Sequence, residues 1–170
     1  MKTIVLGEHK EIAELIERRR SLGLDGHDEV WDGVYVMAPF AHSNHGRLKS
    51  QLVYALEQRA RSAGLLSGDS FNLGEKDNFR VPDAGYHREL PGVLYVPTAA
   101  LVLEVLSSDD ETFAKFDFYA AHGVDELMVA DPEARTIRSW QLIAGAYVEQ
   151  PCSALLDVEV ATLVAEVDWP

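Results

Sequence analysis

The stretch VPDAGYHRELPGVLYVPTAALVLEVLSSDDETFAKFDFY, from Val81 to Tyr119, decides the fold of this chain. Its centre, Ala99–Leu106, is an apolar run that one charged residue, Glu104, interrupts. An apolar run of this length predicts a strand that is buried on both faces. We therefore place this strand in the middle of the domain.

Glu104 is the most informative residue of the run. A carboxylate in a buried strand costs free energy unless it is paired, hydrogen-bonded or bound to a metal. The alternative is that Glu104 stands at the strand end and points to solvent, but apolar Val105 and Leu106 follow it. The pattern favours a buried carboxylate with a partner.

A helix is expected after this strand. Ser108-Asp109-Asp110-Glu111 has the spacing of a capping box, and Gly123 ends the helix. Lys115 and Tyr119 are four residues apart and therefore share one face. An exposed ion pair between Lys115 and Glu111 is the alternative for this lysine. The stripe expected to be buried consists of Phe113, Phe116 and Ala120.

A longer helix is expected from Ser43 to about Ser62, with Ser43 or Asn44 as its cap. His45 lies in its first turn, where exposed backbone N–H groups attract anions. His45 is therefore a candidate for binding a substrate phosphate. A lone histidine is also often structural or merely exposed, and the sequence leaves this alternative open.

Pro82 cannot donate to a sheet ladder, so Asp83 is expected at a strand start, an edge or a bulge. Asp32-Gly33 between apolar residues predicts a β-hairpin. The fold class is expected to be α/β or α+β, as a single domain over residues 1–170 with a mixed central β-sheet flanked by helices and a C-terminal β-hairpin. The expected sheet segments are Glu29–Met37, Gly68–Tyr86, Ala99–Leu106 and Leu127–Ala130, with Thr136–Ile143 and Tyr147–Gln150 as the hairpin.

Composition limits the partners of the chain. Fifteen basic and twenty-eight acidic residues give a net charge of −13, which disfavours a broad nucleic-acid-binding face.

No apolar segment is long enough to span a membrane, and the apolar run at the N-terminus is too short for a signal peptide. Cys152 is the single cysteine, so no internal disulfide forms, and a reducing cytoplasm is the expected location. Exposed apolar edges or Cys152 leave a homodimer open.

The two acids suggest a chemistry if they lie on neighbouring strands. Asp83 and Glu104 would then offer oxygen ligands that suit Mg²⁺ or Mn²⁺, and the backbone carbonyl of Val105 is a further candidate ligand. Such an ion would bind a phosphate oxygen and lower the pKa of a bound water, which makes the water a nucleophile. The ammonium of Lys115 would stabilise the charge that develops on the phosphate.

The ordered set of motifs resembles the Uma-type family of restriction endonuclease-like proteins, within the PD-(D/E)XK nuclease superfamily. The resemblance covers about residues 25–145, and the motifs that carry it are Pro82-Asp83, Leu103-Glu104-Val105-Leu106-Ser107, Lys115 with Tyr119, Gly123-Val124 and Val129-Ala130-Asp131-Pro132. It implies a restriction endonuclease-like core, Asp83 and Glu104 as metal ligands, and Lys115 as the catalytic lysine.

Two positions depart from the pattern that the resemblance implies: the lysine position, and Ser107-Ser108-Asp109, which stands in place of Ser-Pro-Ser and adds an acid near the site. The usual lysine position, two residues after the second acid, is Leu106, and the family pattern moves the lysine to the following helix, as Lys115 does here. An acid from an earlier segment often joins such sites, and Glu29 is the candidate; no role is assigned to Tyr119.

These observations predict a metal-dependent endonuclease that hydrolyses phosphodiester bonds of nucleic acid, DNA being the first candidate. Two alternatives stay open. The net charge favours a non-catalytic interaction or regulatory protein that keeps the nuclease-like fold. A hydrolase that acts on a small phosphorylated substrate would need no basic groove.

Overall fold

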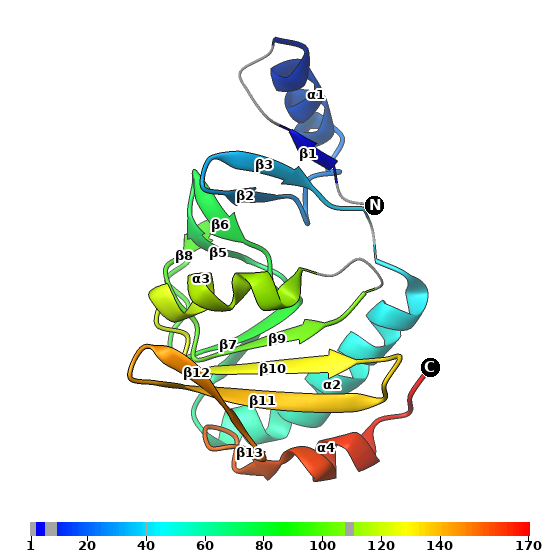
Figure 1. Ribbon diagram of the computed structural model, residues 1–170, viewed down its shortest axis with the longest axis vertical. Coiled ribbons are helices and arrows are strands. Elements are labelled where there is room, and N and C mark those ends of the chain that lie inside the picture. Colours follow the sequence, from blue (N-terminus) through cyan, green and yellow to red (C-terminus); the bar gives the residue numbers. More distant parts are fainter. Residues whose placement is uncertain (1–2, 6–9, 40, 108–110) are drawn as a thin grey trace.

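The computed structural model describes residues 3–5, 10–39, 41–107 and 111–170. Two six-stranded β-sheets, a short two-stranded sheet and the helices around them form a mixed α and β fold (Figure 1), so the predicted fold class is confirmed. The elements are, in order, β1 (Thr3–Val5), α1 (Lys10–Ser21), β2 (Glu29–Trp31), β3 (Val34–Met37), α2 (Ser43–Ser62), β4 (Leu66–Gly68), β5 (Asn72–Glu75), β6 (Asn78–Arg80), β7 (Ala84–His87), β8 (Tyr95–Val96), β9 (Leu101–Val105), the 3-10 helix η1 (Thr112–Lys115), α3 (Phe116–Ala121), β10 (Glu126–Asp131), β11 (Thr136–Ile143), β12 (Ala146–Gln150), β13 (Cys152–Ser153), β14 (Val158–Glu159) and α4 (Val160–Glu166).

The central sheet has the strand order β12-β11-β10-β9-β7-β4. Its middle strands β9 and β10 are parallel, whereas the other neighbours are antiparallel. Every residue of β9 is buried, as the apolar run predicts. The predicted hairpin of β11 and β12 extends this sheet.

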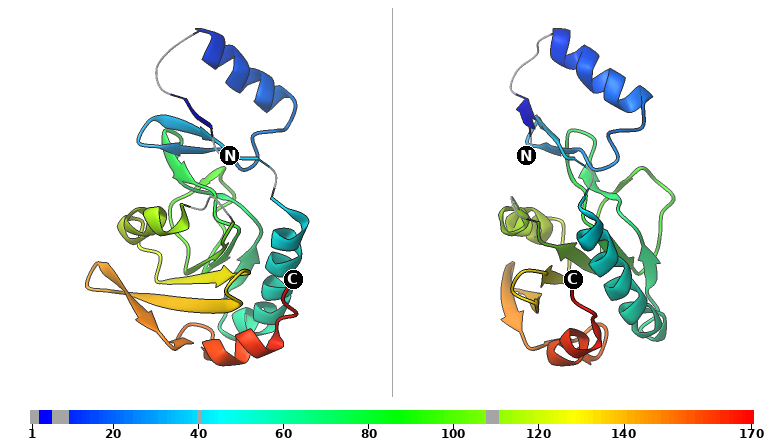
Figure 2. Two further views of the ribbon diagram at one scale, coloured as in Figure 1. Left: turned by 45° about the vertical axis from the view of Figure 1, so that its right-hand side comes forward. Right: turned by 90° about the vertical axis from the view of Figure 1, so that its right-hand side faces the viewer.

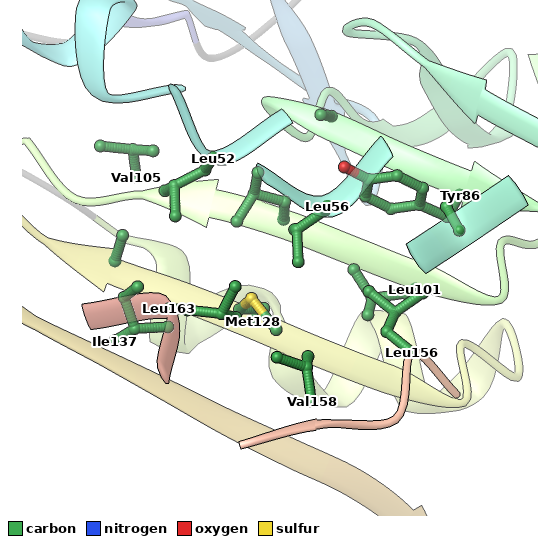
Figure 3. Close-up of a cluster of buried hydrophobic side chains, with 14 of the residues drawn as sticks. Leu52, Leu56, Tyr86, Leu101, Val105, Met128, Ile137, Leu156, Val158 and Leu163 are labelled. Atoms are coloured by element: carbon green, nitrogen blue, oxygen red, sulfur yellow. The ribbon is translucent and has the colours of Figure 1, made fainter. Parts of the chain in front are cut away.

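Side chains of β9 alternate between two cores. Leu101, Leu103 and Val105 pack against α2 and α4, together with residues of β7, β10 and β11 (Figure 3). Val102 belongs to a second cluster with residues of α3 and β10. Because strand residues alternate, Glu104 lies on the same face as Val102, under η1 and α3.

The N-terminal sheet has the order β1-β3-β2-β6-β5-β8. The expectation that Glu29–Met37 joins the central sheet is therefore wrong, although the hairpin itself is confirmed. The expected segment Gly68–Tyr86 is divided, because β5 and β6 also belong to the N-terminal sheet and only β4 and β7 to the central one. The physical reason lies at Pro82. The chain leaves the N-terminal sheet after β6 and enters the central sheet at β7, and Pro82, which has no N–H to continue a ladder, lies in the crossing.

The segment of η1 and α3 buries a different face from the expected one. Thr112, Lys115 and Tyr119 are buried, whereas Phe113 is 49% exposed. The polar stripe turns inward because it has buried carboxylates to bind. The exposed alternative for Lys115 is thus wrong; the predicted capping box begins in residues 108–110, outside the described residues, and Glu111 makes no side-chain cap.

The remaining helices differ from the predictions only in detail. Helix α2 has the predicted bounds, but its cap is His42, whose side chain accepts from the amide of Asn44. Helix α1 has no buried residue and stands apart from the two sheets (Figure 2). None of the helices in the described part of the chain is long and apolar enough to cross a bilayer.

Candidate active site

The crossing between the two sheets is held by two carboxylates. The amide of Val81 donates to Oε1 of Glu29 at 2.9 Å, and the amide of Asp83 lies 3.4 Å from Oε2 of Glu104. The backbone on both sides of Pro82 is thus fixed by acids from β2 and β9. This arrangement explains why Asp83 sits beside Glu104 although neither residue is near the other in the chain.

The carboxylate of Asp83 is the most accessible acid of the group. Its Oδ2 accepts the amide of Val105 at 2.8 Å and lies 3.1 Å from Nε2 of His45. The side chains of Asp83 and His45 are 18% and 13% exposed. His45, in the first turn of α2, therefore stands at the edge of the site next to Asp83.

Behind Asp83 lies a buried charge network. Nζ of Lys115 lies 2.8 Å from Oε1 of Glu29 and 3.3 Å from Oε1 of Glu104. The hydroxyl of Tyr119 donates to the same Oε1 of Glu104 at 2.5 Å. Glu29, Glu104, Lys115 and Tyr119 are each less than one-tenth exposed, so little water screens these charges.

Burial sets the protonation of the network. It raises the pKa of Glu104 to about 7, against the opposing charge of Lys115 and with the help of nearby Asp83. For Lys115, burial alone would lower the pKa, but the carboxylates of Glu104 and Glu29 outweigh it and raise the pKa. Burial and Glu104 also raise the pKa of Tyr119, which keeps its hydroxyl protonated as a donor.

The pKa of His45 moves in the opposite direction from that of most buried histidines. Burial opposes the charged imidazole, but the hydrogen bond and the charge of Asp83 prevail, and the pKa is raised above 6.5. Nδ1 of His45 is buried and has no hydrogen-bond partner among the described residues. The backbone of Val105 also favours the charged ring, so His45 is held against the end of β9 as well as against Asp83.

A stacked arginine holds Glu29 in place. The guanidinium of buried Arg80 lies between the rings of Trp31 and Phe118, 4.2 Å and 4.1 Å from their centroids. Nε1 of Trp31 in turn donates to Oε2 of Glu29 at 2.6 Å. The two cation–π contacts of Arg80 thus join β2 to α3, and the charged hydrogen bond fixes Glu29 within β2.

A pocket of about 650 Å³ opens beside His45, where β9 and β10 end. This is the edge with the start of α2 and the C-terminus, at the right in Figure 1. Ligands of open α/β sheets usually bind outside the carboxyl ends of the strands. The pocket therefore borders His45, the side chain that contacts Asp83.

The oxygen atoms of Asp83 and Glu104 fit one hard divalent ion whose remaining ligands are water and substrate phosphate. Oδ1 of Asp83 forms no hydrogen bond with the described residues, and Oε2 of Glu104 has only the distant amide of Asp83. No group of three or more His, Cys, Asp or Glu in the described ranges forms a metal cage. Mg²⁺ commonly binds through one or two carboxylates and completes its shell with water and substrate phosphate, so the pair is compatible with it.

The structure brings together Asp83, Glu104, Lys115 and His45, and adds Glu29, the candidate third acid. Trp31 and Arg80 were not predicted as site residues from the sequence. The sequence did contain a signal for Trp31. Residues two apart on a strand share a face, so Trp31 is expected on the same face as Glu29. No local sequence signal pointed to Arg80, because its partners come from β2 and α3, which are far away in the chain.

Comparison with known proteins identifies the family. Residues 14–169 match the model of the Uma2 family, which is described as "Putative restriction endonuclease". The chain belongs to the Uma2 family. This confirms the resemblance found in the sequence.

One solved structure shares the fold of this Uma2 protein. It is titled as a "putative nuclease belonging to DUF820 from Anabaena variabilis ATCC 29413" and is 15% identical in sequence, with a TM-score of 0.63. The match covers 82% of this chain and 90% of the other. At this identity the likeness shows the fold alone. A search of curated proteins finds no match.

Proposed function

We propose that this Uma2 protein is a Mg²⁺- or Mn²⁺-dependent nuclease that hydrolyses phosphodiester bonds of nucleic acid. The observation that carries the proposal is the placement of the partly exposed Asp83 next to the buried pair of Glu104 and Lys115. The family description supports the same activity. The catalytic residues would be Asp83, Glu104 and Lys115.

Asp83 and Glu104 would hold the ion, with the backbone carbonyl of Val105 as a further oxygen ligand. When bound, a divalent ion polarises the scissile phosphate and lowers the pKa of a water molecule. The amide of Val105 and the imidazole of His45 orient the Asp83 carboxylate, while Tyr119 fixes the rotamer of Glu104. Ligands held in this way are already in position before substrate arrives.

Lys115 would stabilise negative charge that develops on the phosphate during hydrolysis. Its raised pKa keeps it an ammonium across the working range of pH. Oε1 of Glu29 accepts a hydrogen bond from Nζ of Lys115 and so fixes the direction of the ammonium. We assign Glu29 the role of a positioning residue for Lys115.

His45 would bind a phosphate oxygen of the substrate. Its raised pKa favours the imidazolium, which adds positive charge at the edge of the site. The start of α2 adds backbone N–H groups and the positive end of a helix dipole. This local positive charge offsets part of the net charge of −13.

Cleavage assays with Mn²⁺ or Mg²⁺ and single- or double-stranded DNA test the proposal. Asp83→Asn and Glu104→Gln should each abolish cleavage, whereas Glu126→Gln, which changes a buried glutamate of β10 bonded to Ser153 and Leu155, should leave it intact. Equal behaviour of the wild type and both site variants would contradict the enzyme.

A non-catalytic protein with the same fold is the second candidate. It is favoured by the burial of Glu104 and Lys115, which would give a stable ion pair without any reaction. Such a protein would show no Mn²⁺-dependent rise in melting temperature, and Asp83→Asn would not change its affinity for a divalent ion.

A further inference from the structure

Phe113 is an exposed aromatic ring beside the candidate active site. It lines the pocket at the ends of β9 and β10, which His45 borders as well. The residue is 49% exposed, yet its ring is backed by Phe116 and Trp140, with centroids 5.4 Å and 6.0 Å away. A ring that is fixed from behind and open in front is a stacking platform for a planar group.

The charges around the pocket exclude a phosphate backbone from most of it. Asp131 and Glu133 line it, and none of its described lining residues is Lys or Arg. A nucleobase differs from a phosphate in this respect, because its amino and imino N–H groups are donors that a carboxylate accepts. The pocket therefore suits a base, while the phosphate would lie at the His45 end.

Outside this pocket, few lysine or arginine side chains in the described ranges are free to bind the phosphates along a duplex. Most lysines and arginines of the described ranges already form an ion pair with a carboxylate. A protein that grips duplex DNA over its length neutralises several phosphates with such residues. Because most of these side chains are paired and the net charge is −13, little positive charge remains to neutralise the phosphates of a duplex.

We infer that the site takes an unpaired nucleotide, with its base stacked on Phe113, and acts on single-stranded rather than duplex nucleic acid. The inference rests on the proposed nuclease activity and adds its substrate class. A volume of about 650 Å³ lies within the usual range for small-molecule sites, so the pocket has room for one nucleotide.

The first arm of the test measures cleavage. An unstructured DNA oligonucleotide and the same sequence in a duplex are incubated with the full chain and Mn²⁺, for the wild type, Phe113→Ala and Phe113→Trp. Base stacking on one ring is worth about 1–3 kcal/mol, so Phe113→Ala should raise KM for the single strand by about 5- to 160-fold with little change in kcat. Phe113→Trp should retain a low KM, and Tyr54→Ala, which removes an 86% exposed ring of α2, should behave as the wild type.

The second arm measures binding without catalysis. Fluorescence anisotropy of labelled single-stranded and duplex oligonucleotides is recorded in EDTA with the same variants, after thermal melting has shown that each is folded. Preferential binding of the single strand that Phe113→Ala weakens supports the inference even if no cleavage occurs.

The outcomes separate the two claims. Duplex cleaved or bound as well as the single strand, or an unchanged KM in Phe113→Ala, overturns the inference and leaves the proposed nuclease intact. Absence of cleavage of both substrates by the wild type contradicts the proposed nuclease, and the binding arm then decides the pocket: no binding of the single strand overturns the inference too.

Discussion

Nζ of Lys115 lies 2.8 Å from Oε1 of Glu29, although the two residues are 86 positions apart in the chain. Glu29 belongs to the N-terminal sheet, whereas Lys115 ends the 3-10 helix that covers the central sheet. The same ammonium also contacts Glu104 of β9. One buried cation therefore connects both sheets and the helical layer at the candidate active site.

Removal of that cation should destabilise the fold. Lys115→Met leaves Glu29 and Glu104 buried without their counter-ion, and loss of one partner of a buried ion pair typically costs about 3–5 kcal/mol. Urea denaturation measures the change in the free energy of unfolding. Lys10→Met, which removes an exposed pair with Glu14, should leave that free energy unchanged; similar values for both variants would show that the network is not stabilising.

Trp31→Phe tests the hydrogen bond of Trp31 separately from the contacts of its aromatic ring. The variant keeps an aromatic surface against Arg80 but loses the hydrogen bond to Oε2 of Glu29, and a hydrogen bond to a charged group is worth about 1.5–3 kcal/mol. We expect lower stability and also lower kcat, because Glu29 then fixes Lys115 less firmly. Trp169→Phe is the matched control, since its Nε1 donates to the neutral carbonyl of Val164 and not to a carboxylate. A loss of stability with unchanged kcat would mean that Trp31 has a structural role alone.

The raised pKa of Glu104 predicts a pH dependence of stability in metal-free buffer. Between its ordinary value of 4.5 and about 7, the carboxyl is ionised in the unfolded chain but still protonated in the fold. The folded state then binds more protons, so the stability from this group is complete below about 4.5 and is lost as the pH rises to about 7.

Glu104→Gln isolates that contribution, because glutamine does not titrate. The difference in the free energy of unfolding between wild type and variant should fall by up to about 1.4 kcal/mol per pH unit across this window. Denaturation curves at several pH values in EDTA measure it. A difference that is independent of pH from 4 to 8 would contradict the raised pKa.

A bound divalent ion should stabilise the wild type. At a concentration of one hundred times its dissociation constant, a ligand adds about 2.7 kcal/mol to the free energy of unfolding, so Mn²⁺ should raise Tm by several degrees. Asp83→Asn should abolish the shift, while Glu126→Gln should keep it. An equal shift in all three proteins would place the ion elsewhere.

The sequence was sufficient for the elements whose patterns are local. The apolar run around Glu104, the turn at Asp32-Gly33 and the periodicity of α2 predicted their structures correctly because each depends on neighbouring residues. The division into two sheets was missed, since strand pairing over long distances leaves no local signal. Pro82 marked the break, but not the sheet to which each side belongs.

The helix after β9 shows the limit of apolar periodicity. Phe113, Phe116 and Ala120 have the right spacing for a buried stripe, yet Lys115 and Tyr119 are the buried residues. Buried carboxylates of other elements override the apolar pattern here, because an unpaired Glu104 would cost more than an exposed phenylalanine. Such a reversal can be predicted only where the partners are already known.

The most direct measurement is anomalous diffraction from crystals of the full chain soaked in Mn²⁺. We predict a peak at the manganese edge within coordination distance of both Asp83 and Glu104, which is absent from crystals of Asp83→Asn. A peak at another position, or none at a saturating concentration of Mn²⁺, would contradict the proposal that these two carboxylates hold the catalytic ion.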